Sequence, residues 1–270
     1  MILSFSNQKG GVGKTTTTLN VAVFLAQKGM KTLLIDLDPQ ANLTSGLGYS
    51  KAHSYEAEKL DKIGEHAKSQ PTIYEVLVGE RMMSEVFIST RIDNLFLVPS
   101  SIDLAGAEID MVSMMNREGL LKKALKNVKD QFDFILIDCP PSLGLITINA
   151  LTGSDKVIVP VQCEYFALEG LGQLLDTIKL VKNNLNQNLE VGGVVLTMFD
   201  GRTRLSEQVV SEVKEFFKDK VFESVIPRNI RLSESPSHGL SISEYDLNSS
   251  GAKSYERLAT EFINRFSNKQ

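Results

Sequence analysis

Short apolar runs alternate with longer segments of helical character along this chain of 270 residues. The run Phe134-Ile135-Leu136-Ile137 lacks the alternation of apolar and polar residues, which is typical of strands buried on both faces of a parallel sheet. The predicted strands are Ile2–Ser6, Thr32–Asp36, Leu95–Pro99, Phe134–Asp138, Lys156–Val161, Val191–Met198 and Val221–Ile226. The segment Thr15–Lys28 predicts a helix that ends before Gly29. The alternation predicts an α/β fold, a doubly wound, mostly parallel sheet with helices on both faces.

A single domain over residues 1–270 is expected from the length and from the absence of a Pro/Gly-rich linker. The main break in composition is the polar, charged segment Tyr49–Gln70, which we expect to be a surface excursion. No apolar run reaches the roughly 18 residues of a membrane span. The first residues lead into a strand without a basic leader, and Cys139 and Cys163 have no CxxC spacing. These features favour a cytoplasmic protein.

The formal net charge of −4 argues against a chain that coats DNA through its overall field. Any binding of nucleic acid is therefore expected from a local basic patch, which a dimer could assemble. Lys122, Lys123, Lys126 and Lys129 form one basic group, but the apolar positions among them indicate an ordinary amphipathic helix.

A glycine-rich loop connects the first predicted strand to the first predicted helix. It departs from the ordinary phosphate-loop pattern GxxxxGKS/T, because Gln8 replaces the first glycine. The glycines allow positive φ and a close approach of a polyphosphate, while free amides at a helix N-terminus bind anions. Lys14 is predicted to reach the β- and γ-phosphates of ATP, and the Thr15 hydroxyl to bind Mg²⁺. The predicted nucleotide-binding residues of the loop are Lys9, Gly10, Gly11, Val12, Gly13, Lys14, Thr15 and Thr16.

Carboxylates end two of the predicted strands that flank this loop. Asp36 ends one strand and Asp38 follows it, and Asp138 ends another strand. Carboxylates at such places hold Mg²⁺ or orient the attacking water in nucleotide hydrolysis. Asp36 fits better as an ordinary turn cap that supports the site.

The form KGGVGKT, with a second lysine, resembles the deviant phosphate loop of the group that includes ParA, MinD and the nitrogenase iron protein. The resemblance implies an ATP-sandwich homodimer in which Lys9 crosses the interface to the partner's nucleotide. It also implies that Asp38 positions the nucleophilic water and that Asp138 lies near the metal. The catalytic residues predicted in this way are Lys9, Lys14 and Asp38.

Later segments resemble the ParA/Soj partition ATPases in particular. These are Val159–Gly170, reading VPVQCEYFALEG, and Val225–Glu234, reading VIPRNIRLSE. The resemblance implies an ATPase that binds duplex DNA without sequence preference and segregates it with a ParB-type partner that stimulates hydrolysis. It nominates Pro227 and Asn229 as adenine contacts, and Arg202 and Arg231 as DNA contacts. A nucleoid-associated location follows. The family often has a lysine after PSHG, where this chain has Leu240.

Two other classes of function share the same loop. A membrane-surface positioning ATPase like MinD would dock through a C-terminal amphipathic helix. The C-terminal apolar positions have helical spacing without a basic excess, which favours packing on the core. A metabolic ATPase or iron–sulfur reductase is the other class, and the placement of the cysteines argues against the reductase. The sequence leaves open whether the cargo is a chromosome, a plasmid or a protein assembly.

Overall fold

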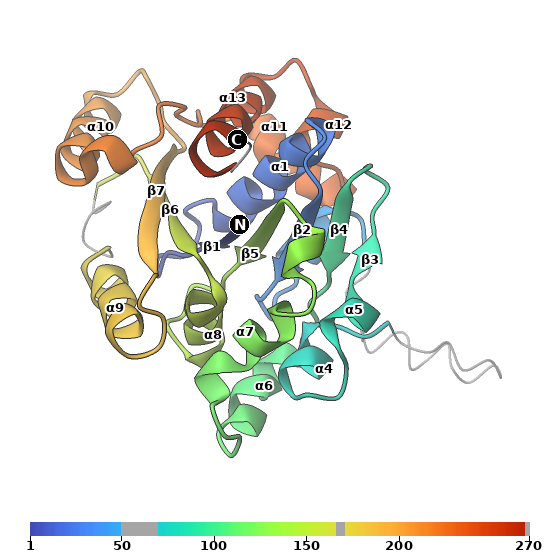
Figure 1. The fold of residues 1–270 in the computed structure, drawn as a ribbon. Helices are drawn as coiled ribbons and strands as arrows, with labels where there is room; N and C mark the ends of the chain where they lie inside the picture. Colours follow the sequence, from blue (N-terminus) through green and yellow to red (C-terminus); the bar gives the residue numbers. More distant parts are fainter. Residues whose placement is uncertain (50–69, 166–170, 268–270) are drawn as a thin grey trace.

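The computed structural model describes residues 1–49, 70–165 and 171–267, and within these ranges it contains a seven-stranded sheet of order β3-β4-β2-β5-β1-β6-β7 (Figure 1). Neighbouring strands are parallel except β3, which pairs antiparallel with β4. The strands are β1 (Ile2–Phe5), β2 (Thr32–Asp36), β3 (Ile88–Ser89), β4 (Leu95–Val98), β5 (Phe134–Asp138), β6 (Lys156–Gln162) and β7 (Glu190–Thr197). The predicted parallel α/β sheet is confirmed.

Helices cover both faces of the sheet (Figure 1). One group comprises α1 (Lys14–Gln27), α11 (Ile230–Glu234), α12 (Ile242–Tyr245) and α13 (Ser250–Phe266). Another comprises α4 (Ile73–Leu77), α5 (Met83–Val86), α6 (Leu104–Met111), α7 (Leu120–Leu125) and α8 (Leu145–Gly153). The remaining α-helices are α2 (Asn42–Gly46), α9 (Leu171–Asn184) and α10 (Arg204–Phe217), and the 3₁₀ turns are η2 (Arg117–Gly119), η3 (Lys129–Gln131), η4 (Lys218–Lys220) and η5 (Ser235–His238).

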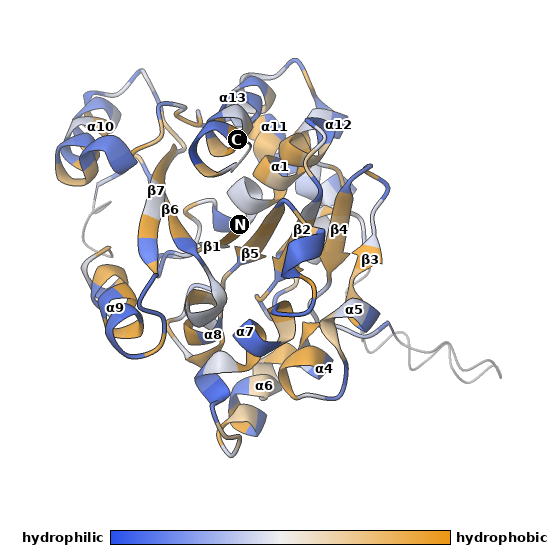
Figure 2. Ribbon diagram, in the orientation of Figure 1, coloured by the Kyte–Doolittle hydropathy of each residue, from blue (hydrophilic) through white to orange (hydrophobic). Residues whose placement is uncertain are grey.

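The strands divide their side chains between these two layers. Leu34 and Leu136 pack with α1 and α13, whereas Leu33 and Ile135 pack with the helices of the other face. Successive side chains of a strand point to opposite faces, so a strand covered on both sides must be apolar throughout. Figure 2 accordingly shows mostly hydrophobic residues along the strands and many hydrophilic residues along the surrounding helices and loops. This explains the unbroken apolar runs in the sequence.

Helix α1 begins and ends at glycines with left-handed backbone angles. Gly13 precedes it with φ of 83°, and Gly29 follows it with φ of 82°. The amide of Gly29 donates to the carbonyl of Ala26 and that of Met30 to the carbonyl of Leu25, which is the hydrogen bonding of a Schellman C-terminus. The predicted helix end before Gly29 is confirmed.

The prediction of a strand over Val221–Ile226 is wrong. The segment forms isolated parallel bridges, Val194 with Val221 and Phe199 with Pro227. Between them, the amides of Glu223 and Ser224 donate to the Glu261 carboxylate at 2.9 and 2.8 Å. The amides of Phe222 and Ile226 still donate to the carbonyls of Val194 and Leu196 in β7. The ladder is interrupted between them because the Ser224 amide donates to Glu261 of α13.

The predicted surface excursion is largely untested, whereas the predicted packing of the C-terminal segment is confirmed. Most of the excursion predicted over Tyr49–Gln70 lies outside the described residues, although Tyr49 itself packs against the core. The C-terminal apolar stripe was predicted to pack on the core, and α13 confirms this. Its Tyr255, Leu258 and Phe262 are at most 1% exposed. Among the helices of the described residues, none is long and apolar enough to span a membrane.

Candidate active site

A cavity of about 610 Å³ lies at the carboxyl ends of the strands, where β1 turns into α1. Ligands of open α/β sheets bind at this edge. The cavity brings together the phosphate loop, the segment after β2 and the turn after β5. Its lining residues are Gly10, Gly11, Gly13, Lys14, Thr15, Thr16, Leu19, Asn20, Asp38, Gln40, Asn42, Ser45, Pro141, Met198, Ser235, Pro236 and Ser237.

The phosphate loop is held open by contacts at its two ends. Asn7 donates to the carbonyl of Pro160 at 2.7 Å and accepts from the amide of Lys9 at 3.0 Å. The Thr197 hydroxyl donates to the carbonyl of Val12 at 2.8 Å. No side chain of the described residues caps α1 at Gly13. The first amides of α1 therefore face the cavity as an anion site.

The two lysines of the loop lie in different environments. Lys14 is only 7% exposed and its Nζ donates to the carbonyl of Lys9 at 3.3 Å, whereas Lys9 itself is exposed. Burial lowers the pKa of Lys14, and the negative charge of Asp138 opposes that shift. Lys14 thus places its amino group inside the cavity, while Lys9 is free to contact a molecule outside it.

Asp138 ends β5 beneath the loop and is completely buried. Burial and the nearby charge of Asp36 raise its pKa to about 8, while the nearby Thr15 hydroxyl and the charge of Lys14 oppose the shift. Thr18 donates to its Oδ1 at 3.3 Å, but its Oδ2 has no hydrogen-bond partner among the described residues. A buried carboxylate oxygen without a donor is suited to a metal-bound water or a cation.

Asp36 organises the turn that carries Asp38. Its Oδ2 accepts from the amide and hydroxyl of Thr44 at 2.9 and 2.7 Å, and its Oδ1 accepts from the amide of Asp38 at 3.1 Å. Burial raises its pKa to about 6 against these hydrogen bonds. Asp38 is half-buried and lines the cavity, and its Oδ1 accepts from the amide of Gln40. The interpretation of Asp36 as a supporting cap agrees with these contacts.

The residues nominated for adenine lie outside the phosphate cavity. Pro227 lines a neighbouring cavity of about 1070 Å³ between the end of β7 and α13. Asn229 caps α11, accepting from the amide of Arg231 at 2.8 Å and donating to the Ser250 hydroxyl at 2.8 Å. Their predicted role stays a prediction.

The two arginines nominated for DNA are exposed but paired within the chain. Arg202 donates to both carboxylate oxygens of Asp200, at 2.9 and 2.7 Å, and 87% of its side chain is exposed. Arg231 donates to Glu234 at 3.0 Å and approaches Asp246 at 3.6 Å. Exposed pairs of this kind contribute little stability, so either guanidinium can exchange its partner for a phosphate.

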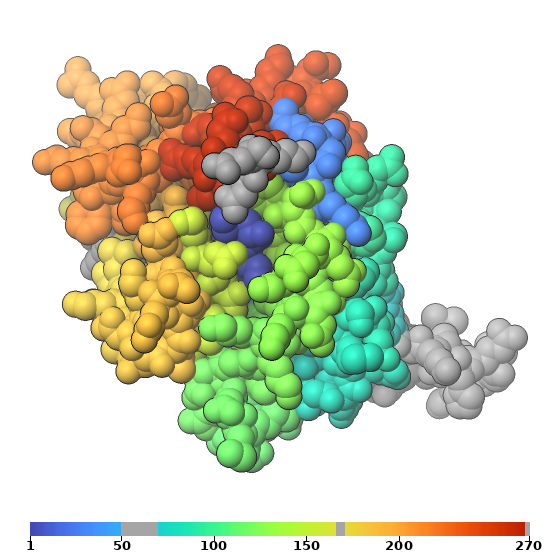
Figure 3. Space-filling view, viewed as in Figure 1, coloured from blue at the N-terminus to red at the C-terminus, as the bar shows by residue number. Residues whose placement is uncertain are grey.

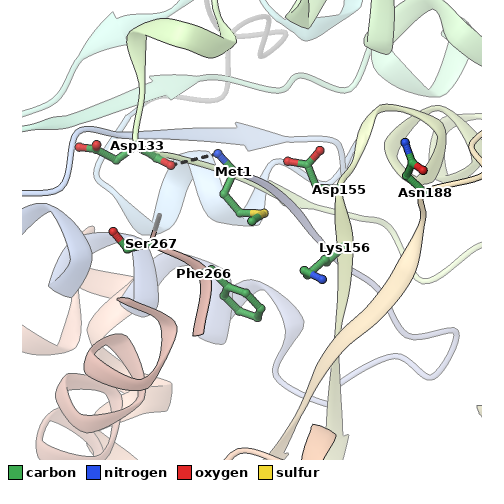
Figure 4. Close-up of a pocket in the computed structure, with 7 residues that line it drawn as sticks. All are labelled: Met1, Asp133, Asp155, Lys156, Asn188, Phe266 and Ser267. Carbon is green, nitrogen blue, oxygen red and sulfur yellow. Dashed lines mark hydrogen bonds between the residues drawn. The ribbon is translucent and has the colours of Figure 1, made fainter. Parts of the chain in front are cut away.

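A further cavity of about 520 Å³ lies at the opposite, amino-terminal edge of the sheet (Figure 4). There the Met1 amino group donates to the carbonyl of Asp133, close to Lys156 at the start of β6. In the space-filling view, the dark blue start of the chain lies between the red C-terminal segment and the green and yellow middle of the chain (Figure 3). None of the residues that line this cavity was predicted as a site residue.

Two residues near the cavity escaped the sequence analysis. Arg91, in the turn after β3, binds Leu47, Gly239 and Glu244. Glu108 of α6 accepts from the amide of Ile146 in the first turn of α8 at 3.2 Å. Neither belongs to a motif, and only the three-dimensional contacts reveal them.

The fold, the deviant loop and the two carboxylates at the strand ends define a P-loop ATPase. Residues 1–191 match the AAA domain family. The chromosome-partitioning ATPase Soj of Treponema pallidum is 50% identical over 263 residues, 97% of each chain. The sporulation initiation inhibitor protein Soj of Bacillus subtilis is 52% identical over 260 residues, covering 96% of this chain and 97% of that protein. The chain belongs to the ParA/Soj family of chromosome-partitioning ATPases.

A solved structure gives the same fold with nucleotide bound. Cobyrinic acid a,c-diamide synthase from Mycobacterium smegmatis, with an ATP analogue and magnesium, has a TM-score of 0.81 and 35% identity. It covers 100% of this chain and 96% of its own. That structure holds an ATP analogue and magnesium in this fold. In this chain, the Asp138 Oδ2 without a hydrogen-bond partner among the described residues is suited to a cation.

Proposed function

We propose that the chain is an ATP-switched homodimer that binds duplex DNA without reading its sequence. A ParB-type centromere-binding partner stimulates hydrolysis and so releases the DNA. Similarity to chromosome-partitioning ATPases over nearly the whole chain supports this function. The protein would then act in the cytoplasm on the nucleoid.

The main support for a dimer is that the two lysines of the loop lie in different environments, Lys14 buried and Lys9 exposed. Lys14 already places its buried amino group in the cavity, so Lys9 is not needed there by its own subunit. Lys9 is exposed at the rim of the same loop. In the sandwich, each Lys9 reaches the phosphates held by the other subunit, so that dimerisation depends on ATP.

Hydrolysis needs positioning and neutralisation of charge more than covalent chemistry. The amides of Gly10–Thr16 hold the polyphosphate and Lys14 neutralises the β- and γ-phosphates. Asp38 orients the water that attacks the γ-phosphorus, with ADP as the leaving group. Thr15 and Asp138 would hold Mg²⁺, which would supply further neutralisation of phosphate charge. Asp138 must lose its proton to do so.

The DNA surface of the dimer combines the patches of two subunits. Arg202 and Arg231 donate to phosphate oxygens, which positions the protein without specifying a sequence. Pro227 and Asn229 border the adenine. Since each monomer pairs these arginines with its own carboxylates, a single subunit offers little positive surface.

A MinD-like membrane function has less support. The apolar positions of the C-terminal helix pack against the sheet, where Phe262 stacks on Phe5 and Phe222. Exposing them to a lipid surface would open the core.

Binding to unrelated duplexes, measured with and without ATP, tests the proposal. We expect binding only with ATP, with a steep fall as salt rises at a slope near ~0.9 per phosphate neutralised. Equal binding by the ATP-free monomer, or a strong preference for one sequence, would contradict it.

A further inference from the structure

Two short elements that pack against each other line one part of the phosphate cavity. Helix α2 contributes Asn42 and Ser45, and the η5 turn contributes Ser235, Pro236 and Ser237. Helices of one turn are not stable alone, because nucleation costs more than one turn of hydrogen bonds returns. The position of each element must therefore be fixed by contacts from outside.

The two elements come together behind the cavity at two glycines. Gly48 and Gly239 have φ of 80° and 65°. A Cβ on Gly239 would lie 2.6 Å from the Cα of Gly48, so the two backbones meet with no room for a side chain. Because the backbones approach so closely, the carbonyl of Leu47 after α2 and that of Gly239 after η5 lie near each other.

Arg91 binds at that place. Its Nη1 donates to the carbonyl of Leu47, directly after α2, and its Nη2 donates to the carbonyl of Gly239, directly after η5, at 2.7 Å. The last carbonyls of a helix lack partners and carry partial negative charge, so one cation can satisfy both ends. A planar guanidinium with several donors suits this geometry, whereas a lysine does not.

Glu244 holds the guanidinium in position. Its Oε1 accepts from Arg91 Nε at 2.7 Å and its Oε2 from Nη2 at 2.9 Å. Glu244 is itself fixed in the capping box of α12, where Oε2 accepts from the Ser241 amide at 3.0 Å. Burial opposes ionisation of Glu244, but the hydrogen bonds from Arg91 and Ser241 outweigh it and hold its pKa below the ordinary value.

We propose that Arg91 is a positioning residue for ATP: by binding the carbonyls of Leu47 and Gly239, it fixes α2 and η5 against each other in the arrangement that lines the phosphate cavity. None of its hydrogen-bond partners lines the cavity, so it acts through the backbone of these two elements. The proposal depends on the ATPase activity of the family and not on DNA binding or dimerisation.

Arg91→Ala, Arg91→Lys and Glu244→Ala, with the exposed Arg81→Ala as matched control, test the proposal in steady-state ATPase assays. Melting temperatures and circular dichroism identify the folded fraction. For Arg91→Ala we expect the KM for ATP to rise roughly tenfold, because ordering α2 and η5 now opposes binding, with kcat within about twofold of wild type. Arg91→Lys and Glu244→Ala should give smaller rises in KM, and Arg81→Ala none.

A purely structural role would lower the melting temperature and leave the KM of the folded protein unchanged, and that result would overturn the proposal. If Arg91→Ala does not fold, Glu244→Ala and Arg91→Lys decide the matter. Wild-type KM in both would overturn the proposal, and a raised KM in both would support it.

Discussion

Asp36 and Asp138 occupy paired positions at the carboxyl ends of the neighbouring parallel strands β2 and β5, and both are completely buried. Burial raises the pKa of both carboxyls, and the charge of Asp36 raises that of Asp138 further. For Asp36 hydrogen bonds from Thr44 limit the rise, whereas Asp138 keeps an oxygen without a donor. The difference separates their roles: Asp36 fixes a turn, and Asp138 is available to a cation.

The first prediction is that the nucleotide-free protein loses stability as pH rises from about 4 to about 8. Across that window the folded state keeps a proton on Asp138, whose pKa is about 8, while the unfolded chain loses it. Asp138→Asn should flatten the decline and be more stable than wild type at pH 8, with a residual slope near pH 4–6 from Asp36. Urea unfolding at several pH values measures this. The exposed Asp93→Asn is the control, and an unchanged pH slope in Asp138→Asn would contradict the prediction.

Much of this site could be predicted from the sequence because local chemistry determines it. Positive φ at Gly11 and Gly13 and the helix start at Lys14 depend on residues within the loop itself. Asp38 and Asp138 could be placed because strand ends at one edge of a parallel sheet converge.

Other features depend on contacts between distant segments, which no local pattern encodes. Residues Val221–Ile226 have the composition of a strand, but Glu261 of α13 accepts from the Ser224 amide and so interrupts the ladder with β7. In the sequence, Arg91 has no feature that distinguishes it from a surface arginine. Its role depends on Leu47 and Gly239, which are distant in sequence and lie beside it only in the folded chain. Arg202 and Arg231 came from family resemblance, and their pairing with nearby carboxylates appears only in three dimensions.

Lys14→Ala should weaken ATP binding by at least roughly 100-fold, because the β- and γ-phosphates lose the cation inside the loop. Isothermal titration with ATP and Mg²⁺ measures this. Lys28→Ala, after the other end of α1, is the matched control and should bind normally. Normal affinity in Lys14→Ala would remove the basis for the assignment of this cavity.

Asp38→Ala and Lys9→Ala should fail at different steps. The Asp38 variant loses only the group that orients water, so it should bind ATP and accumulate as a dimer without hydrolysis. The Lys9 variant keeps its own phosphate loop but loses the contact across the interface, so it should bind ATP and stay monomeric. Size-exclusion chromatography with ATP separates the two. A monomeric Asp38 variant, or a dimeric and fully active Lys9 variant, would show that these roles are wrong.

Gly144→Ala should destabilise the protein through Glu108. A Cβ on Gly144 would lie 2.2 Å from Glu108 Oε1, which accepts the Ile146 amide at the start of α8. The substitution should cost roughly 1 kcal/mol in wild type, because the Glu108 carboxylate must swing away from the Ile146 amide, and much less in a Glu108→Ala background, where that hydrogen bond is already gone. Urea unfolding of wild type, Gly144→Ala, Glu108→Ala and the double variant gives the coupling free energy between the two positions. Equal costs in both backgrounds would mean that the carboxylate moves aside freely.

Replacing Arg202 or Arg231 with alanine should weaken ATP-dependent DNA binding equally for all sequences. Each subunit of the dimer loses a phosphate contact, so fewer counterions are released and the salt slope should become shallower by roughly one to two units. ATP binding and dimerisation should be unchanged, since neither arginine lines the phosphate cavity.

Fluorescence anisotropy over a salt series measures the slope, and Lys122→Ala and Lys126→Ala on the other basic group serve as matched controls. Both lysines accompany apolar side chains that pack into the core, Leu121 and Leu125, as on an ordinary amphipathic surface helix. Their loss should leave the slope unchanged. If the lysine variants lose affinity while both arginine variants bind like wild type at every salt concentration, the DNA surface lies on that helix and not beside β7.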